Sequence, residues 1–144
     1  MIDLDDKDSA LVKKSFVKIL PRRNEFSVSL YDRLFEVAPD ARPMFSRDMT
    51  RQREKLVATL TLVVNSANKL SELHDDVREL GRRHVHYGTE LAHYDVLRDV
   101  LVDTLADYLG DDFDTETRAA WGKLYDAVAD VMTGADGKSP SRPH

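Results

Sequence analysis

Apolar residues recur at spacings of three and four along most of this chain, and this period constrains the fold more than any other feature. The clearest stripe consists of Leu56, Leu60, Val63, Val64 and Ala67. Such spacing places side chains on one face of an α-helix, whereas a strand alternates every second residue. No segment alternates convincingly, and no internal repeat is visible. The sequence therefore predicts an all-α protein with about six or seven helices.

Prolines, glycines and capping residues divide the helical pattern into segments. A helix over about 8–20 is expected to stop at Pro21, because proline lacks the amide hydrogen that a helix needs. A second is expected over about 24–37, and Pro39 makes the following piece short. The other expected elements are a polar loop at 46–53 that runs into a helix through 56–67, helices through 73–87 and 94–108 that end at Gly88 and Gly110, and a last helix capped by Asp114 or Thr115. We expect residues 1–134 to form one domain and residues 135–144, which lack large apolar side chains, to be a flexible tail.

The composition excludes several classes of function. With 42% hydrophobic and 33% charged residues, the 144-residue chain is typical of a globular domain. Its formal net charge of −5 argues against nucleic acid or an anionic membrane as the main partner. The absence of cysteine excludes disulfides and thiolate metal sites. No stretch reaches the roughly 18 apolar residues of a membrane span, and the N-terminus lacks the apolar core of a secretory signal, so we expect a cytoplasmic protein.

One of the five histidines, His84, lies in an apolar stripe between Leu80 and Tyr87. The helical period by itself favours the interpretation that His84 is a core histidine bonded to backbone groups. The alternative is a metal ligand, because neutral imidazole is the commonest one. His86 would not share a site with it, because residues two apart point to opposite sides of a helix. Neither a glycine-rich phosphate loop nor an HExxH motif is present, so hydrolytic and phosphoryl-transfer chemistry have no support.

Three stretches together carry a resemblance to a known family. They are LYDRLFEVAPDARPMF at 30–45, ELGRRHVHYGTELAHY at 79–94 and TRAAWGKLYDAVADVM at 117–132. They resemble the globins, and in particular single-domain bacterial haemoglobins, flavohaemoglobin globin domains and neuroglobin. The resemblance runs over about 8–133. It implies a globin fold packed around a haem pocket and a non-covalently bound haem b.

The resemblance also assigns roles to individual residues. The proximal histidine that ligates the haem iron falls on His84, and the phenylalanine that packs on the haem falls on Phe45. The distal position falls on Gln52, with Leu56 one turn later, and Tyr31 points into the distal pocket. Further haem-packing positions fall on Val85, Tyr94 and Tyr125, and candidates for pairing with the haem propionates are Lys55, Arg83 and His86.

The distal set of tyrosine, glutamine and leucine is similar to that of bacterial flavohaemoglobins. It implies that Tyr31 and Gln52 donate hydrogen bonds to bound dioxygen, each worth roughly 1.5–3 kcal/mol, and that dioxygen is released slowly. The alternatives are a core tyrosine bonded to backbone and a glutamine that swings out to solvent. Gln52 would leave the sixth iron position open, with Lys55 as an alternative ligand. The carboxylate that joins Tyr94 near the proximal histidine of flavohaemoglobins falls here on Asp136, which is shorter and lies in the expected tail, so that network is in doubt.

The function implied by the resemblance is reversible binding of dioxygen, nitric oxide and carbon monoxide. Nitric oxide dioxygenation would need a separate reductase, because we expect the chain to end after the globin helices without a flavin domain. One alternative is a haem-based gas or redox sensor that acts through a partner protein. Another is a haem-free helical regulator in which His84 is structural.

Overall fold

The computed structural model describes residues 2–134, so the predictions for the tail and for Asp136 fall outside the described residues. Within that range it contains six α-helices and no strand, which confirms the predicted all-α class. The α-helices are α1 (Asp6–Ile19), α2 (Arg23–Val37), α3 (Thr50–Asn65), α4 (His74–His86), α5 (Leu91–Leu109) and α6 (Thr115–Thr133). Four short 3₁₀ helices connect them, η1 (Leu20–Arg22), η2 (Pro39–Met44), η3 (Ala67–Leu73) and η4 (Gly110–Asp112). Among the described helices, none is both long and apolar enough to cross a membrane.

Local chemistry fixes the helix ends close to the predicted positions. The Asp114 carboxylate accepts a hydrogen bond from the amide of Thr117 at 2.8 Å, so Asp114 rather than Thr115 caps α6. Gly88 follows α4 with φ of 89°, a conformation that only glycine adopts without cost. The helix expected after the polar loop begins earlier, at Thr50, because the Asp48 carboxylate accepts from the Thr50 amide at 2.9 Å.

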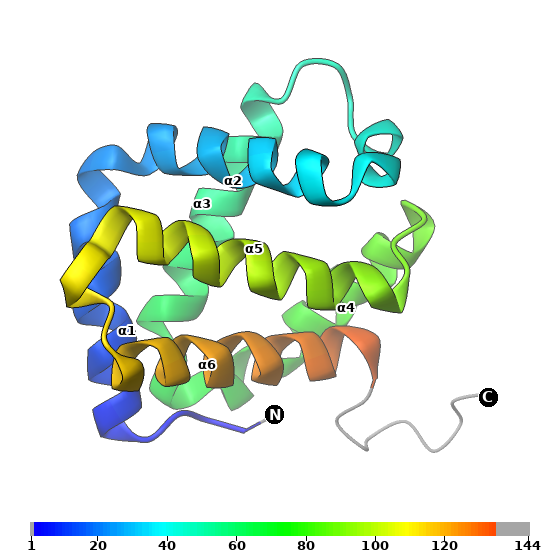
Figure 1. Cartoon of the computed structure of the whole chain (residues 1–144). Coiled ribbons are helices and arrows are strands. Elements are labelled where there is room, and N and C mark those ends of the chain that lie inside the picture. Colours follow the sequence, from blue (N-terminus) through cyan, green and yellow to red (C-terminus); the bar gives the residue numbers. More distant parts are fainter. Residues whose placement is uncertain (1, 135–144) are drawn as a thin grey trace.

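The helices enclose one apolar core. Figure 1 shows α2, α5 and α6 lying one below another, with α3 and α4 behind them. The indole of Trp121 on α6 donates to Ser15 Oγ on α1 at 2.8 Å, which satisfies its polar atom in the interior. The largest fully buried side chains are Trp121, Phe26, Ile19, Leu30, Leu70 and Leu105.

The packing partners decide where the candidate site forms. α2 packs on α5 and is joined to α3 through η2, whereas α4 packs mainly on α6. The predicted stripe is buried at Val63 and Val64 near the end of α3 and at Ala67 in η3, but it is only half-buried at Leu56 and Leu60. The N-terminal part of α3 therefore lies at the edge of the core, with apolar side chains that the protein covers incompletely.

Candidate functional site

His84 on α4 is held by its own helix. Its Nδ1 lies 2.8 Å from the carbonyl oxygen of Leu80, one turn earlier. Because a carbonyl can only accept, Nδ1 carries the proton and Nε2 carries the lone pair. No described residue offers a hydrogen bond to Nε2. The imidazole is thus oriented by the backbone and presents a nitrogen that can ligate a metal.

Two aromatic side chains lie beside His84. Its ring centroid lies 6.1 Å from that of Tyr87 and 6.5 Å from that of Tyr94 on α5. Tyr125 on α6 donates its hydroxyl to the carbonyl oxygen of Tyr94 at 2.6 Å, which ties α5 to α6 at this point. Burial raises the pKa of both the Tyr94 and the Tyr125 hydroxyl. The structure therefore places Tyr94 beside His84 and Tyr125 behind Tyr94.

Val85 lies on a different face of α4 from His84. It is 70% exposed and lines a surface pocket of about 440 Å³ together with Gly81, Leu91 and Met132. Successive residues of a helix point in directions about 100° apart, which accounts for the difference. Val85 thus does not share the face of α4 that carries His84, and the haem-packing role that the resemblance gave it stays a prediction.

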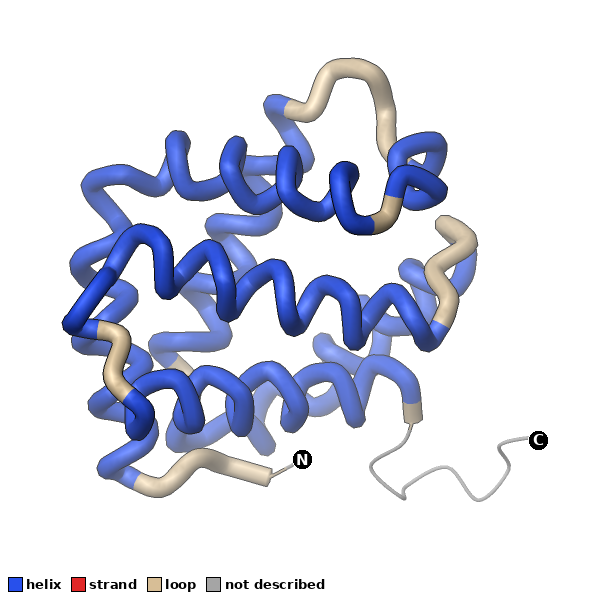
Figure 2. Tube along the Cα trace, viewed as in Figure 1, coloured by secondary structure: helices blue, strands red, loops and turns tan. Residues whose placement is uncertain are grey.

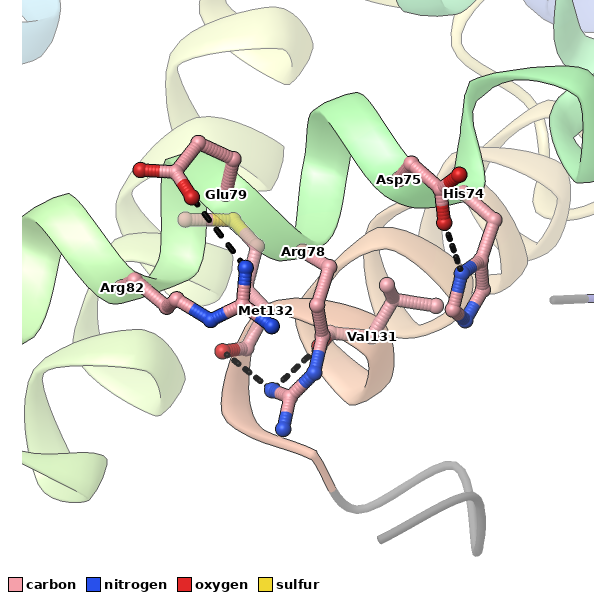
Figure 3. A network of polar contacts seen from close by, with 7 residues as sticks. All are labelled: His74, Asp75, Arg78, Glu79, Arg82, Val131 and Met132. Atoms are coloured by element: carbon pink, nitrogen blue, oxygen red, sulfur yellow. Dashed lines mark hydrogen bonds and ion pairs between the residues drawn. The ribbon is translucent and has the colours of Figure 1, made fainter.

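Close contact with α6 fixes the position of α4. A Cβ at Gly81 would come within 2.1 Å of the Met132 carbonyl oxygen, so only glycine allows this approach. Figure 3 shows Arg78 reaching from α4 to the end of α6, where its Nη1 donates to the carbonyls of Val131 at 3.2 Å and Met132 at 3.5 Å. Since His84 is on the same helix, these contacts also set the position of its imidazole.

Tyr31 and Gln52, to which the resemblance gives positions in the distal pocket, are in contact. Gln52 Nε2 on α3 donates to the hydroxyl oxygen of Tyr31 on α2 at 3.0 Å. An amide NH₂ can only donate, so Tyr31 keeps its own proton for another acceptor. Burial raises the pKa of this hydroxyl, which keeps it protonated. Leu56, one turn after Gln52, is half-buried.

Phe45 joins the same cluster through two aromatic contacts. Its ring packs edge-to-face on Tyr31 at 5.6 Å and on Phe35 at 5.5 Å, and Tyr31 and Phe35 lie 6.0 Å apart. Phe35 was not singled out from the sequence. Its spacing of four from Tyr31 on one helix was the signal that could have found it.

The three candidates for pairing with propionates are all exposed. Lys55 lies on α3, and Arg83 and His86 lie on α4. None of the three forms an ion pair with another residue in the part of the chain that the structure describes. Arg83 also lines a pocket of about 180 Å³ between α3 and α4, next to Leu80. Their side chains are thus available to an anionic ligand.

A second group of possible ligands, Asp40, Glu90 and His93, is better explained as a helix cap. Their ligand atoms all lie within 4.8 Å of one another. However, His93 Nδ1 accepts from the Glu90 amide at 2.9 Å, so Nε2 carries the proton and faces Asp40 Oδ2 at 3.4 Å. A metal on Nε2 would have to displace that proton while Nδ1 still faces a donor. The arrangement instead caps α5, which begins at Leu91.

Comparison with known proteins agrees with this arrangement. The sequence profile of the globin family matches residues 28–132. A flavohemoprotein of Bacillus subtilis (strain 168) is 26% identical over 137 residues, which make up 92% of this chain but only 34% of that protein. An anaerobic nitrite reductase of Gossypium hirsutum is 26% identical over 138 residues, or 85% of each chain. An engineered carbene transferase, whose parent is described as a putative nitric oxide dioxygenase of Rhodothermus marinus, superposes with a TM-score of 0.80 at 25% identity over 96% of both chains.

Proposed function

The chain belongs to the globin family, and from that membership we propose that it binds haem b through His84 and reversibly binds dioxygen and other diatomic gases. The observation that carries the proposal is the 2.8 Å contact between His84 Nδ1 and the Leu80 carbonyl. It leaves Nε2 as a neutral donor atom of the kind that haem iron accepts. When bound, the haem iron would supply an open coordination position for a gas molecule and would exchange one electron.

The proximal residues would orient the iron ligand. The bond from Nδ1–H to Leu80 keeps the imidazole in one tautomer and one rotation, and it makes Nε2 more basic. Tyr94, held through its carbonyl by Tyr125, limits the movement of the ring from the α5 side. Phe45 would supply an aromatic surface for the flat face of the macrocycle.

The distal residues would recognise the gas. Gln52 occupies a lone pair of the Tyr31 oxygen, so the remaining Tyr31 proton is free to be donated to a ligand that carries partial negative charge. A hydrogen bond of this kind is worth roughly 1.5–3 kcal/mol. Because dioxygen accumulates more negative charge than carbon monoxide when bound, the pair would favour dioxygen. Lys55, Arg83 and His86 would hold the propionates at the exposed edge.

Nitric oxide dioxygenation, with electrons from a separate reductase, is a second candidate function. It is supported by the Tyr31–Gln52 hydrogen bond together with the description of the parent of the similar solved structure. The chain spans about a third of the flavohemoprotein that it matches, so the activity of that whole protein is a proposal for this chain. Nitric oxide consumption by the reduced, oxygenated protein, with and without a chemical reductant, would distinguish stoichiometric from repeated turnover.

Titration of the purified chain with haem tests the main proposal. We expect a sharp Soret band that saturates at one haem per chain, and a spectrum of the reduced protein that changes under dioxygen and returns when the gas is removed. A chain that folds but does not saturate with haem would contradict the proposal. It would favour the haem-free regulator.

A further inference from the structure

We propose that Arg42 is a positioning residue, which holds the 45–49 loop so that Phe45 keeps its place against Tyr31. Arg42 lies near the end of η2, and the 45–49 loop connects η2 to α3. Figure 2 shows this loop at the top of the molecule. The proposal deepens the proposed function, on which the distal role of Tyr31 rests.

The guanidinium of Arg42 is bonded to carbonyl groups rather than to a carboxylate. Nη1 donates to the carbonyl oxygens of Phe45 at 3.4 Å and Ser46 at 3.0 Å, and Nη2 donates to that of Arg47 at 3.2 Å. Three consecutive carbonyls therefore converge on one side chain. A planar group with five N–H donors suits this task, whereas an ammonium carries its donors on a single atom.

The same side chain also contacts the aromatic cluster. Its guanidinium carbon lies over the Phe35 ring, 5.1 Å from the centroid. Phe35 in turn packs edge-to-face on Phe45. Arg42 thus restrains Phe45 twice, through the backbone carbonyl of Phe45 and through the neighbouring ring.

The restraint extends to both residues of the distal hydrogen bond. Phe45 packs on Tyr31, which accepts from Gln52. At the other end of the loop, the Asp48 carboxylate accepts from the Thr50 amide and so begins the helix that carries Gln52. A loop that moved freely would loosen the packing on Tyr31 and the start of α3 together.

Two substitutions and a matched control test the proposal in the full chain without haem. Arg42→Ala removes all three hydrogen bonds, and Arg42→Lys keeps the positive charge but loses the planar guanidinium with its several donors. Arg47→Ala is the control, because it removes an exposed arginine from the same loop. We expect the amides of Phe45 and Thr50 to exchange hydrogen about tenfold faster in both Arg42 variants, with weaker nuclear Overhauser contacts between the rings of Phe45 and Tyr31. The Arg47 variant should behave as wild type. Wild-type exchange in Arg42→Ala, or full rescue by Arg42→Lys, would overturn the proposal.

The same variants loaded with haem and carbon monoxide give a spectroscopic readout of the distal side. We expect the carbon monoxide stretching band to broaden and move to higher frequency in both Arg42 variants, because a nearby hydrogen-bond donor lowers that frequency. Faster amide exchange with an unchanged band and unchanged ring contacts would reduce Arg42 to a loop restraint and overturn its positioning role. If the wild type binds no haem, the proposed function fails, and the ring contacts in the haem-free chain still decide the role of Arg42.

Discussion

The proposed roles of His84 and Tyr31 depend on the hydrogen bond that each makes with the protein. The Leu80 carbonyl takes the Nδ1 proton of His84, and the Gln52 amide approaches the lone pair of Tyr31. In His84, the bond at Nδ1 leaves a lone pair on Nε2. In Tyr31, the bond accepted by the hydroxyl oxygen leaves the hydroxyl proton free to be donated. Sequence position assigns the residue, but only the local bond assigns the tautomer and the free proton.

Tyr31→Phe tests the distal donor. Removing the hydroxyl removes the proposed bond to the gas, so we expect dioxygen to dissociate about tenfold faster, as measured by stopped flow. Tyr108→Phe is the control, because the Tyr108 hydroxyl bonds to Ser29 at 2.8 Å and not to Gln52 or Tyr31. An unaltered rate in Tyr31→Phe, or an equal change in the control, would remove Tyr31 from this role.

The pH dependence of the same rate tests the state of the Tyr31 proton. Burial raises the pKa of this hydroxyl above the ordinary value of 10.0, so the neutral donor form predominates below that pH. We expect the dissociation rate to show no titration by Tyr31 between about pH 6 and pH 9, and to rise only at higher pH. A rise with a midpoint below about pH 9 that disappears in Tyr31→Phe would mean that the hydroxyl ionises too easily.

At the scale of elements, the seating of α4 on α6 determines where His84 can lie. Gly81 permits the close approach to Met132, and Arg78 bonds to the carbonyls at the end of α6. The exposed face of α4 carries Arg82 and Arg83, so it contributes little packing of its own. The position of the imidazole therefore depends on this helix contact as well as on the contacts of the ring with Leu80 and Tyr94.

Gly81→Ala tests this contact. Alanine favours helix over glycine by roughly 0.5–1 kcal/mol, but its Cβ would meet immovable backbone at 2.1 Å, and overpacking costs about 1–3 kcal/mol. We expect a lower melting temperature and weaker haem retention. In the control Gly122→Ala, the Cβ meets only the flexible end of Arg98 at 2.6 Å, so stability should change little. Equal effects of the two substitutions would contradict the account.

The elements themselves were largely predictable, because proline, glycine and capping chemistry act locally. Helix ends at Gly88 and at the Asp114 cap follow from such signals. The early start of α3 was missed, since it depends on the Asp48 side chain bonding within a loop. The contact between Tyr31 and Gln52 agrees with their assigned positions, although their roles stay predictions. The carbonyl contacts of Arg42 depend on tertiary packing that periodicity does not contain.

Across the whole molecule, buried phenols link stability to alkaline pH. Burial raises the pKa of Tyr31, Tyr94 and Tyr125 above their ordinary value, so the folded chain holds their protons more tightly than the unfolded chain does. The contribution of these hydroxyls to the free energy of unfolding is fully present below about pH 10, which is the pKa of tyrosine in the unfolded chain. It falls as the pH rises above that pKa.

Urea denaturation at a series of pH values checks this linkage. We expect the free energy of unfolding to fall steeply above about pH 10, and the slope to become shallower in Tyr125→Phe, which has one such phenol fewer. The hydrogen bond to the Tyr94 carbonyl is lost as well, so the variant should be less stable at neutral pH. If the free energy of unfolding fell equally steeply above about pH 10 in the wild type and in Tyr125→Phe, Tyr125 would have the same pKa in the folded and unfolded chain.

Haem binding by His84→Ala, compared with His86→Ala, tests the central claim most directly. His86 lies two residues away on the same helix and is exposed, so its removal preserves the fold and the neighbouring charge pattern. We expect His86→Ala, which loses one of three proposed propionate contacts, to bind haem somewhat more weakly but to keep the histidine-ligated haem spectrum. We expect His84→Ala to lose stable haem binding and to recover a ligated haem spectrum when free imidazole is added. Wild-type haem retention in His84→Ala without imidazole would contradict the claim that this nitrogen ligates the iron.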